Sequence, residues 1–294
     1  MTITVEFGIF TLLCGILFAS IWADSEVPPI LADACPNGGE AFRKCWKERR
    51  REILELFRTH VYGRRPSTEI RVRWDMLRAD PNAMEGKATL KEVRFHASTD
   101  RGSLMFPMVL FVPNEREGAV PVFLLILHHK PEEKMDPTRV QRSETWPAEE
   151  IVEAGFAAAV FHAGAISANN REALSGGIHA LVDPEERSSD LWGTIGAWAW
   201  GASRVLDYLE TDPDVDVQRV AVIGHSRGGK AALWAGAQDE RFWITISNNS
   251  GCTGAALARR RKGETVRQIN SAFPHWFCGR YKTYNDREED LPVD

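Results

Sequence analysis

The feature that most constrains the fold is an apolar run that leads directly into a glycine-rich turn and then into a helical segment. The run Arg219 to Ile223 ends at Gly224-His225-Ser226-Arg227-Gly228, and residues 229–235 have a helix-forming composition. Glycines at this spacing let a strand reverse sharply into a helix, because a Cβ would bring neighbouring backbones too close. A strand, a tight turn and a helix in this order predict an α/β fold whose turn presents a serine.

Ser226 in this G-x-S-x-G turn is the candidate catalytic nucleophile. The pattern also occurs by chance in loops, and the strand before it and the helix after it are what favour a nucleophile here. The positive end of the helix and the backbone N–H of Arg227 would stabilise the oxyanion that forms when the serine attacks a carbonyl.

The rest of the chain agrees with an α/β sheet. Alternating apolar residues predict a pair of strands at 90–97 and 104–112, with Gly102 at the turn between them. Wholly apolar runs, typical of strands covered on both faces, follow at 120–127, 156–161, 220–223 and 242–246. Helices are predicted around 49–60 and from Ser188-Ser189-Asp190 to Leu209. We expect a mostly parallel sheet covered by helices, in one domain from residue 24 to residue 294.

The N-terminal segment is free of charge from Phe7 to Ala23 and ends in small residues, which predicts a signal peptide at 1–23. An uncleaved membrane anchor is the alternative, because the n-region lacks Lys and Arg and the run nearly spans a bilayer. We therefore expect a secreted or periplasmic protein, with a membrane as partner only if the segment is uncleaved.

Cysteine usage supports export, because removal of the signal takes Cys14 and leaves four cysteines. Their order suggests that Cys35 pairs with Cys45 and Cys252 with Cys278, although four cysteines allow three connectivities and buried free thiols are the alternative. Their spacing fits no zinc site, so we expect no metal and no cofactor. The formal net charge of −5 and the scattered basic residues argue against nucleic acid as a partner.

His275 is the one histidine that follows Ser226 in this chain. Serine hydrolases of the α/β-hydrolase fold place the acid and then the histidine after the nucleophile, the histidine beyond the last strand. His275 lies in the aromatic cluster Phe273-Pro274-His275-Trp276-Phe277 before any further apolar strand, so we interpret it as a packed or rim histidine, with general base as the less favoured role.

Several motifs in the second half of the chain carry a family resemblance. They are Gly224-His225-Ser226-Arg227-Gly228-Gly229-Lys230, Gly236-Ala237, Ser250-Gly251-Cys252, Pro274-His275-Trp276-Phe277 and Leu291-Pro292-Val293-Asp294. With them the chain resembles the glucuronoyl esterases (4-O-methyl-glucuronoyl methylesterases) and the acetyl xylan esterase-like bacterial carbohydrate esterases grouped with them. The resemblance implies the α/β-hydrolase fold and a serine esterase whose partner is a plant cell-wall carbohydrate ester. It also implies that Arg227 helps to form the oxyanion hole, that Lys230 holds the uronic acid, and that Glu264 and Trp276 lie at the sugar.

The chain departs from the family pattern at several positions. Asn249 stands where many members carry the acid of the triad, Glu264 lies near an expected glutamine and Ala272 near an expected glutamate. In relatives the closing Leu-Pro-Val-Asp leads into later strands that bear the acid and the histidine, so we expect the domain to be C-terminally incomplete. The leading hypothesis is an exported glucuronoyl esterase-like enzyme. The alternatives are an acetyl xylan or other acyl esterase, an inactive carbohydrate-binding or remnant hydrolase domain, and a peptidase.

Overall fold

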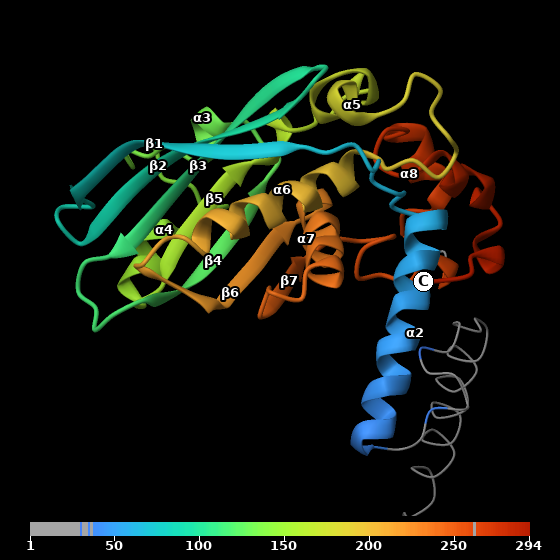
Figure 1. Ribbon diagram of the computed structural model, residues 1–294, viewed down its shortest axis with the longest axis horizontal. Coiled ribbons are helices and arrows are strands. Elements are labelled where there is room, and N and C mark those ends of the chain that lie inside the picture. The colour runs from blue at the N-terminus through green and yellow to red at the C-terminus, as the bar shows by residue number, and fades with distance from the viewer. Residues whose placement is uncertain (1–29, 31–34, 36–37, 261–262) are drawn as a thin grey trace, which may run out of the picture.

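A seven-stranded sheet lies at the centre of the computed structural model, which describes residues 30, 35, 38–260 and 263–294 (Figure 1). The strands are β1 (Arg71–Ala83), β2 (Ala88–Thr99), β3 (Gly102–Pro113), β4 (Val120–Leu127), β5 (Ala157–His162), β6 (Val215–His225) and β7 (Ile244–Asn248). The α-helices are α2 (Gly39–His60), α3 (Pro131–Lys134), α4 (Ala148–Glu153), α5 (Gly177–Val182), α6 (Thr194–Leu209), α7 (Arg227–Gln238) and α8 (Val266–Ala272). Short 3-10 helices are η1 (Ala163–Ala165), η2 (Ala173–Ser175), η3 (Ala258–Arg260), η4 (Gly279–Tyr284) and η5 (Glu288–Asp290).

The strand order β1-β2-β3-β5-β4-β6-β7 joins an antiparallel part to a parallel part. The first three strands form an antiparallel meander, and β3 also runs antiparallel to β5. Strands β5, β4, β6 and β7 are parallel to one another. The carboxyl ends of these four strands therefore meet at one edge, which is where α/β sheets place their functional residues.

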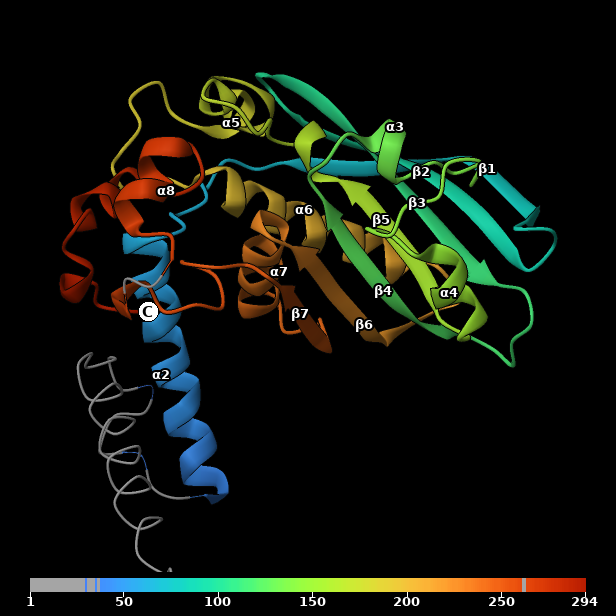
Figure 2. The same ribbon diagram turned by 180° about the vertical axis from the view of Figure 1, so that it is seen from behind.

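Helices cover both faces of the sheet, which is why the central strands are apolar throughout. In β4, Leu124 packs into the core beneath α6 and α7, whereas the next residue, Leu125, packs into the core beside α4. Figures 1 and 2, seen from opposite sides, show α6 and α7 on one face and α4 on the other. The prediction that these runs are strands buried on both faces is confirmed for β4, β5 and β6, whereas β7 lies at the edge of the sheet and its residues are exposed or half-buried.

The predicted hairpin is present, and one strand was missed. Thr99 of β2 pairs with Gly102 of β3, so the turn lies where the alternating pattern indicates it. The strand β1 precedes this hairpin at the edge of the sheet, and most of its residues are exposed. Because an edge strand with little burial needs few apolar side chains, β1 carries a weak sequence signal.

The helix that was expected to begin at Ser188-Ser189-Asp190 begins later, at Thr194. Its first turn is capped by distant backbone: the N–H of Thr194 donates to the carbonyl oxygen of His275 (2.9 Å), and that of Ile195 to Trp276 (3.2 Å). A Cβ on Gly193 would lie 2.3 Å from the Trp276 carbonyl oxygen, so only glycine fits there. The cap comes from a remote segment, which the local N-cap residues could not indicate.

Of the two suggested disulfides, one forms. Cys35 is bonded to Cys45 at the start of α2, whereas Cys252 and Cys278 are free and buried, so the prediction that they pair is wrong. The Cys278 thiol lies 3.8 Å from the carbonyl oxygen of Thr59, and the Cys252 thiol lies 3.6 Å from Thr253 Oγ1. Each thiol is thus packed among separate neighbours, as expected from the alternative prediction that these two cysteines are buried free thiols.

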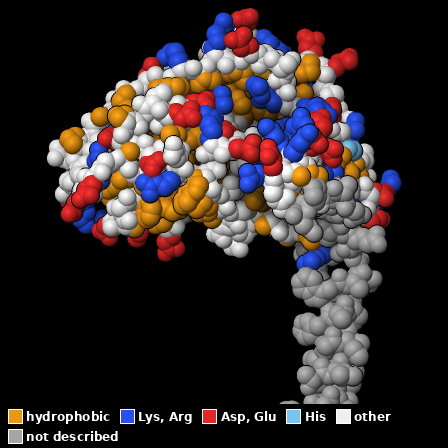
Figure 3. Space-filling model, turned by 60° about the horizontal axis from the view of Figure 1, so that its bottom comes forward, with side chains coloured by type: hydrophobic (Ala, Val, Ile, Leu, Met, Phe, Trp, Pro, Cys, Tyr) orange, Lys and Arg blue, Asp and Glu red, His pale blue; other side chains and the backbone are white. Residues whose placement is uncertain are grey.

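The predicted signal peptide lies outside the described residues. Within the described part of the chain, no helix has the length and apolarity that a membrane span requires. On the face drawn in Figure 3, Lys and Arg side chains alternate with Asp and Glu side chains, and no basic stripe forms there.

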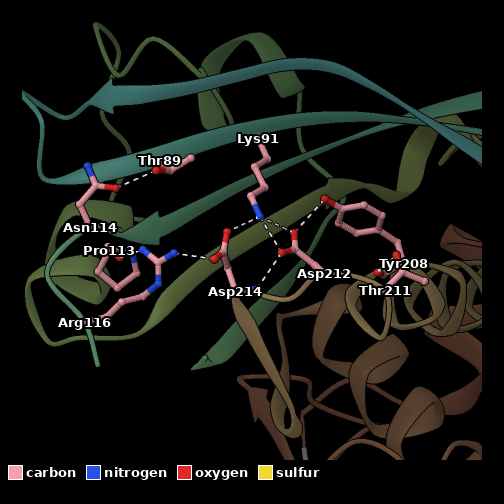
Figure 4. A network of polar contacts seen from close by, with 9 residues as sticks. All are labelled: Thr89, Lys91, Pro113, Asn114, Arg116, Tyr208, Thr211, Asp212 and Asp214. Carbon is pink, nitrogen blue, oxygen red and sulfur yellow. Dashed lines mark hydrogen bonds and ion pairs between the residues drawn. The ribbon is translucent and has the colours of Figure 1, made fainter. Parts of the chain in front are cut away.

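A buried ionic network lies at the end of the sheet opposite the carboxyl ends of the parallel strands (Figure 4). Lys91 Nζ on β2 donates to both carboxylate oxygens of Asp212 (2.6 and 2.8 Å) and to Asp214 (2.7 Å). Tyr208 at the end of α6 donates to Asp212 (3.0 Å), and Arg116 donates to Asp214 (2.5 Å). The lysine lowers the pKa of Asp214 by hydrogen bonding to its charged form. The network joins the antiparallel part of the sheet to the turn before β6.

Candidate active site

Ser226 lies at a sharp turn between β6 and α7. Its backbone has φ 55° and ψ −123°, a strained conformation for a residue with a side chain. The N–H of Ser226 donates to the carbonyl oxygen of Asn248 on the neighbouring strand β7 (2.8 Å), which holds the turn against the sheet. This is the geometry expected of a nucleophile elbow, in which the serine stands above the end of the strand.

The glycines of the motif are required by close backbone contacts. A Cβ on Gly224 would lie 2.0 Å from the carbonyl oxygen of Gly228, two residues beyond the serine. A Cβ on Gly228 would lie 2.9 Å from the carbonyl oxygen of Ile126 on β4, and one on Gly229 would lie 3.0 Å from that of Gly224. The tight packing of the turn therefore explains why these three positions hold glycine.

The helix that follows supplies a positive environment at the serine. The N–H groups of Arg227 and Gly228 belong to the first turn of α7, where no preceding helical carbonyl can accept from them. The positive end of the helix dipole adds to their effect. Ser226 and Arg227 are both partly exposed, so a substrate carbonyl can reach this end of the helix.

The side chain of Arg227 rests against two stacked aromatic rings. Its Cζ atom lies 4.9 Å from the ring centroid of Trp276 and 5.1 Å from that of Phe273. The two rings are parallel, with centroids 3.8 Å apart. Arg227 Nε is buried and has no hydrogen-bond partner among the described residues. A buried N–H donor without a partner is rare, and this one belongs to the residue that directly follows the serine.

Lys230, one turn further along α7, is only 2% exposed. Its ammonium donates to the carbonyl oxygens of Ser250 (2.6 Å) and Cys252, and it lies 6.0 Å from the Trp276 ring centroid. Burial lowers the pKa of Lys230, and the nearby charge of Glu264 opposes that effect. In the described structure Lys230 thus fixes the loop after β7, and its contact with a uronic acid stays a prediction.

Trp276 and His275 lie beside the nucleophile turn and are 3% exposed. Both rings are hydrogen-bonded to Asn169 Oδ1, which lies 2.8 Å from Trp276 Nε1 and 3.1 Å from His275 Nε2. Burial, followed by the charge of Arg227, lowers the pKa of His275 to about 4. Among the described residues no side chain is hydrogen-bonded to Ser226 Oγ, and the one hydrogen bond of the His275 ring goes to Asn169. Its role as general base stays a prediction.

Two residues of this region were missed by the sequence reading. His128 follows β4 and stacks on Trp198, with centroids 5.9 Å apart, and its Nδ1 atom faces the backbone of Gly228. Burial lowers the pKa of His128 to about 3. Asn169 lies in the loop beyond β5. Both residues follow parallel strands whose carboxyl ends lie near Ser226. Polar residues that follow such strands are candidates for the site, and this rule could have identified His128 and Asn169 from the sequence.

Asn249 and Glu264 are both exposed at the outer edge of the site. Asn249 stands at the position where many glucuronoyl esterases carry the acid of the triad. Asn249 has φ 48° and follows β7 directly, so an amide stands where a carboxylate would be expected. Glu264 is exposed just before α8, close enough for its charge to oppose the pKa lowering of Arg227 and Lys230. No cluster of three or more metal-ligating side chains occurs in residues 38–260 and 263–294.

Buried neutral histidines near the site predict a pH-dependent stability. Burial lowers the pKa of His128 to about 3 and that of His275 to about 4, from 6.5. The folded state therefore keeps them neutral while the unfolded chain binds protons, so stability is fully present above pH 6.5 and falls as the pH drops. We expect a loss of about 2 kcal/mol for each histidine between pH 7 and pH 5, measured by urea unfolding.

The variant His128→Gln provides the control for this expectation, because it removes one of these titrations. It should reduce the difference in unfolding free energy between pH 7 and pH 5, whatever its effect on stability at pH 7. An unfolding free energy that is equal at the two pH values in the unsubstituted chain would contradict the prediction.

Comparison with known sequences places this geometry in a family. The model of the family described as "Glucuronyl esterase, fungi" matches residues 101–294. Carbohydrate esterase MZ0003, from an unknown prokaryotic organism, is 38% identical over 281 aligned residues, covering 85% of this chain and 65% of that protein. The 4-O-methyl-glucuronoyl methylesterase 1 of Wolfiporia cocos is 37% identical over 120 residues, covering 36% of this chain and 29% of that protein.

Solved structures agree with these sequence matches. A glucuronoyl esterase from Solibacter usitatus superposes with a TM-score of 0.80 at 37% identity, covering 92% of this chain and 75% of that one. A structure described as a promiscuous CE15 esterase from the marine bacterial metagenome superposes with a TM-score of 0.77 at 35% identity, covering 92% and 74%. The α/β-hydrolase fold is thereby confirmed, and the chain spans 65% of the length of the prokaryotic relative above. The chain therefore belongs to the glucuronoyl esterase family.

Proposed function

We propose that this chain carries the nucleophile of an exported serine carboxylic ester hydrolase that cleaves plant cell-wall carbohydrate esters, with glucuronoyl esters as the substrate class. The observation that carries the proposal is the strained turn that presents Ser226 at the start of α7, followed directly by Arg227, whose Nε–H has no partner in the described part of the chain. A strained serine and a fixed cationic donor side by side are suited to acyl transfer.

In this proposal Ser226 Oγ bonds to the ester carbonyl carbon and loses its proton to a general base. The carbonyl oxygen becomes an oxyanion, held by the N–H of Arg227 and by its guanidinium. The bond to the alcohol then breaks, the alcohol takes up the proton, and an acyl-enzyme remains. Water releases the acid by the same two steps and regenerates the serine.

The substrate class is supported by the charges and rings beside the serine. Arg227 and Lys230 bring two positive charges to the first turn of α7, and the Phe273–Trp276 pair lies next to them. The Arg227 guanidinium and the Phe273 ring are partly exposed and suit a sugar that carries a carboxylic ester and hydroxyl groups, whereas Lys230 and Trp276 are buried behind them. The names of the relatives above, which are glucuronoyl and carbohydrate esterases, support the same class.

Two observations favour alternatives. Glu264 and Ala272 differ from the residues expected in glucuronoyl esterases, which favours an acetyl xylan or other acyl esterase. Asn249 provides no carboxylate, which favours a carbohydrate-binding domain without turnover. Export is supported by the charge-free run in 1–23 and by the Cys35–Cys45 disulfide, since disulfides persist in oxidising compartments.

Two assays separate these possibilities. A fluorophosphonate probe should label the chain covalently at Ser226, because labelling requires an activated serine, and Ser226→Ala should not be labelled. A methyl ester of glucuronic acid should be hydrolysed faster than an acetylated xyloside. Preference for the acetyl ester would support the acyl esterase. Absence of labelling, together with retained binding of glucuronoxylan, would support the inactive domain and contradict the proposal.

A further inference from the structure

Asn169 connects two aromatic side chains through a single oxygen atom. The Trp276 indole Nε1 lies 2.8 Å from Asn169 Oδ1, and the His275 imidazole Nε2 lies 3.1 Å from the same atom. An indole N–H can only donate, so the atom facing it must be the oxygen of the amide and not its nitrogen. The orientation of the Asn169 amide is therefore determined by chemistry.

The same contact determines which nitrogen of His275 carries the proton. Because Asn169 Oδ1 can only accept, His275 Nε2 must donate, and the neutral ring keeps its lone pair on Nδ1. His275 Nδ1 is buried without a partner in the described part of the chain. Burial and Arg227 together keep this ring neutral down to about pH 4, the lowered pKa. His275 therefore adds no positive charge beside Arg227.

Both segments that meet at Asn169 are anchored on the first turns of α6. On the side of Asn169, the indole of Trp198 donates to the carbonyl oxygen of Ser167 (2.8 Å). The Ser167 hydroxyl also lies 3.1 Å from Thr194 Oγ1. On the other side, the carbonyl oxygens of residues 275 and 276 accept the first N–H groups of α6. The backbones are thus fixed independently of Asn169, which leaves the orientation of the two rings as its contribution.

The orientation of the Trp276 ring matters because Arg227 rests on it. The guanidinium lies against the stacked Phe273 and Trp276 rings, and its Nε–H has no other partner among the described residues. A rotated indole would shift the guanidinium away from Ser226, and a displacement of about 1 Å at a catalytic group can cost about 10²-fold in rate.

We propose that Asn169 is a positioning residue of this site: its carboxamide oxygen orients the Trp276 indole and the His275 imidazole, and through Trp276 it places the Arg227 guanidinium beside Ser226. The proposal rests on the proposed function only for its effect on rate. Its geometric part concerns the chain's own side chains and can be tested without a substrate.

The geometric test is nuclear magnetic resonance of the ¹⁵N-labelled chain. His275 should carry its ring proton on Nε2. The Arg227 Nε–H resonance, which is assigned by its loss in Arg227→Lys, should show the ring-current shift of the Phe273 and Trp276 rings.

Three variants test these two signatures. Asn169→Leu is similar in size to the natural side chain but removes the acceptor, so both signatures should change. Asn169→Asp keeps an oxygen acceptor and should preserve the Arg227 signature, while its charge raises the pKa of His275. Asn170→Leu, at the exposed neighbouring position, is the matched control and should leave both signatures unchanged.

The kinetic test is the rate of fluorophosphonate labelling. Asn169→Leu should lower the maximal labelling rate about tenfold and change half-saturation less than about threefold, while Asn169→Asp and Asn170→Leu stay close to the unsubstituted chain. A His275 proton on Nδ1, or unchanged Arg227 resonance and labelling in Asn169→Leu, would overturn the proposal. If the unsubstituted chain is not labelled, the proposed function fails, and the resonance signatures alone decide the role of Asn169.

Discussion

Replacing Arg227 by alanine should lower the maximal rate of covalent labelling of Ser226 by about 10²–10³-fold, with a change of less than about threefold in the probe concentration for half-saturation. The donor acts on charge that develops in the transition state, so its loss should affect reaction more than binding. Arg227→Lys keeps the positive charge but not the planar fork of donors, and it should recover part of the rate. Labelling kinetics followed by mass spectrometry provide the measurement.

The matched control for this prediction is Arg219→Ala. Arg219 lies near the middle of the strand that leads to the serine, but it is exposed and pairs with Asp216 (2.5 Å). Its removal should leave labelling unchanged. If Arg227→Ala altered only half-saturation and left the maximal rate intact, Arg227 would be a binding residue and the oxyanion role would be wrong.

Replacing Lys91 by methionine should lower the free energy of unfolding by about 3–5 kcal/mol. The lysine neutralises Asp212, whose side chain is 2% exposed, and it also contacts Asp214. Methionine fills a similar volume but leaves a buried carboxylate without its cation. Urea unfolding at pH 7, followed by far-ultraviolet circular dichroism, measures the effect.

Two further variants test whether the loss of stability in Lys91→Met comes from the buried charge of Asp212. Lys87 lies just before the same strand, and it forms an ion pair with Glu153 in which each side chain is 59% exposed. Because exposed ion pairs contribute little, Lys87→Met should lower the free energy of unfolding by less than about 1 kcal/mol. The double variant Lys91→Met/Asp212→Asn should be more stable than Lys91→Met alone, because the orphaned charge is gone. Equal losses from Lys87→Met and Lys91→Met would show that burial of the network contributes nothing.

The parts of the fold that could be predicted are those whose information is local. The turn around Ser226 carries its own steric requirement in Gly224 and Gly228, and the apolar runs of β4 and β5 reveal coverage on both faces. The position of the serine, the strand before it and the helix after it therefore followed from a few adjacent residues.

The parts that could not be predicted depend on contacts between distant segments. The start of α6 is set by carbonyl groups of residues 275 and 276, and the free state of Cys252 and Cys278 by their separate neighbours. Lys230 carries a charge typical of a surface helix, yet the loop after β7 buries it. Asn169 belongs to no sequence motif, and only the folded chain brings its oxygen to two rings.

The hydrogen bonds that cap the first turn of α6 cannot form until late in the synthesis of this chain. Thr194 and Ile195 find their hydrogen-bond partners only after β6, α7, β7 and α8 have been made, because residues 275 and 276 follow all of them. A nascent chain that has reached the serine turn thus still lacks the aromatic rings on which Arg227 rests. Pairing residues so far apart along the chain requires closure of a long loop, so Ser226 is synthesised before the segment that packs against its turn.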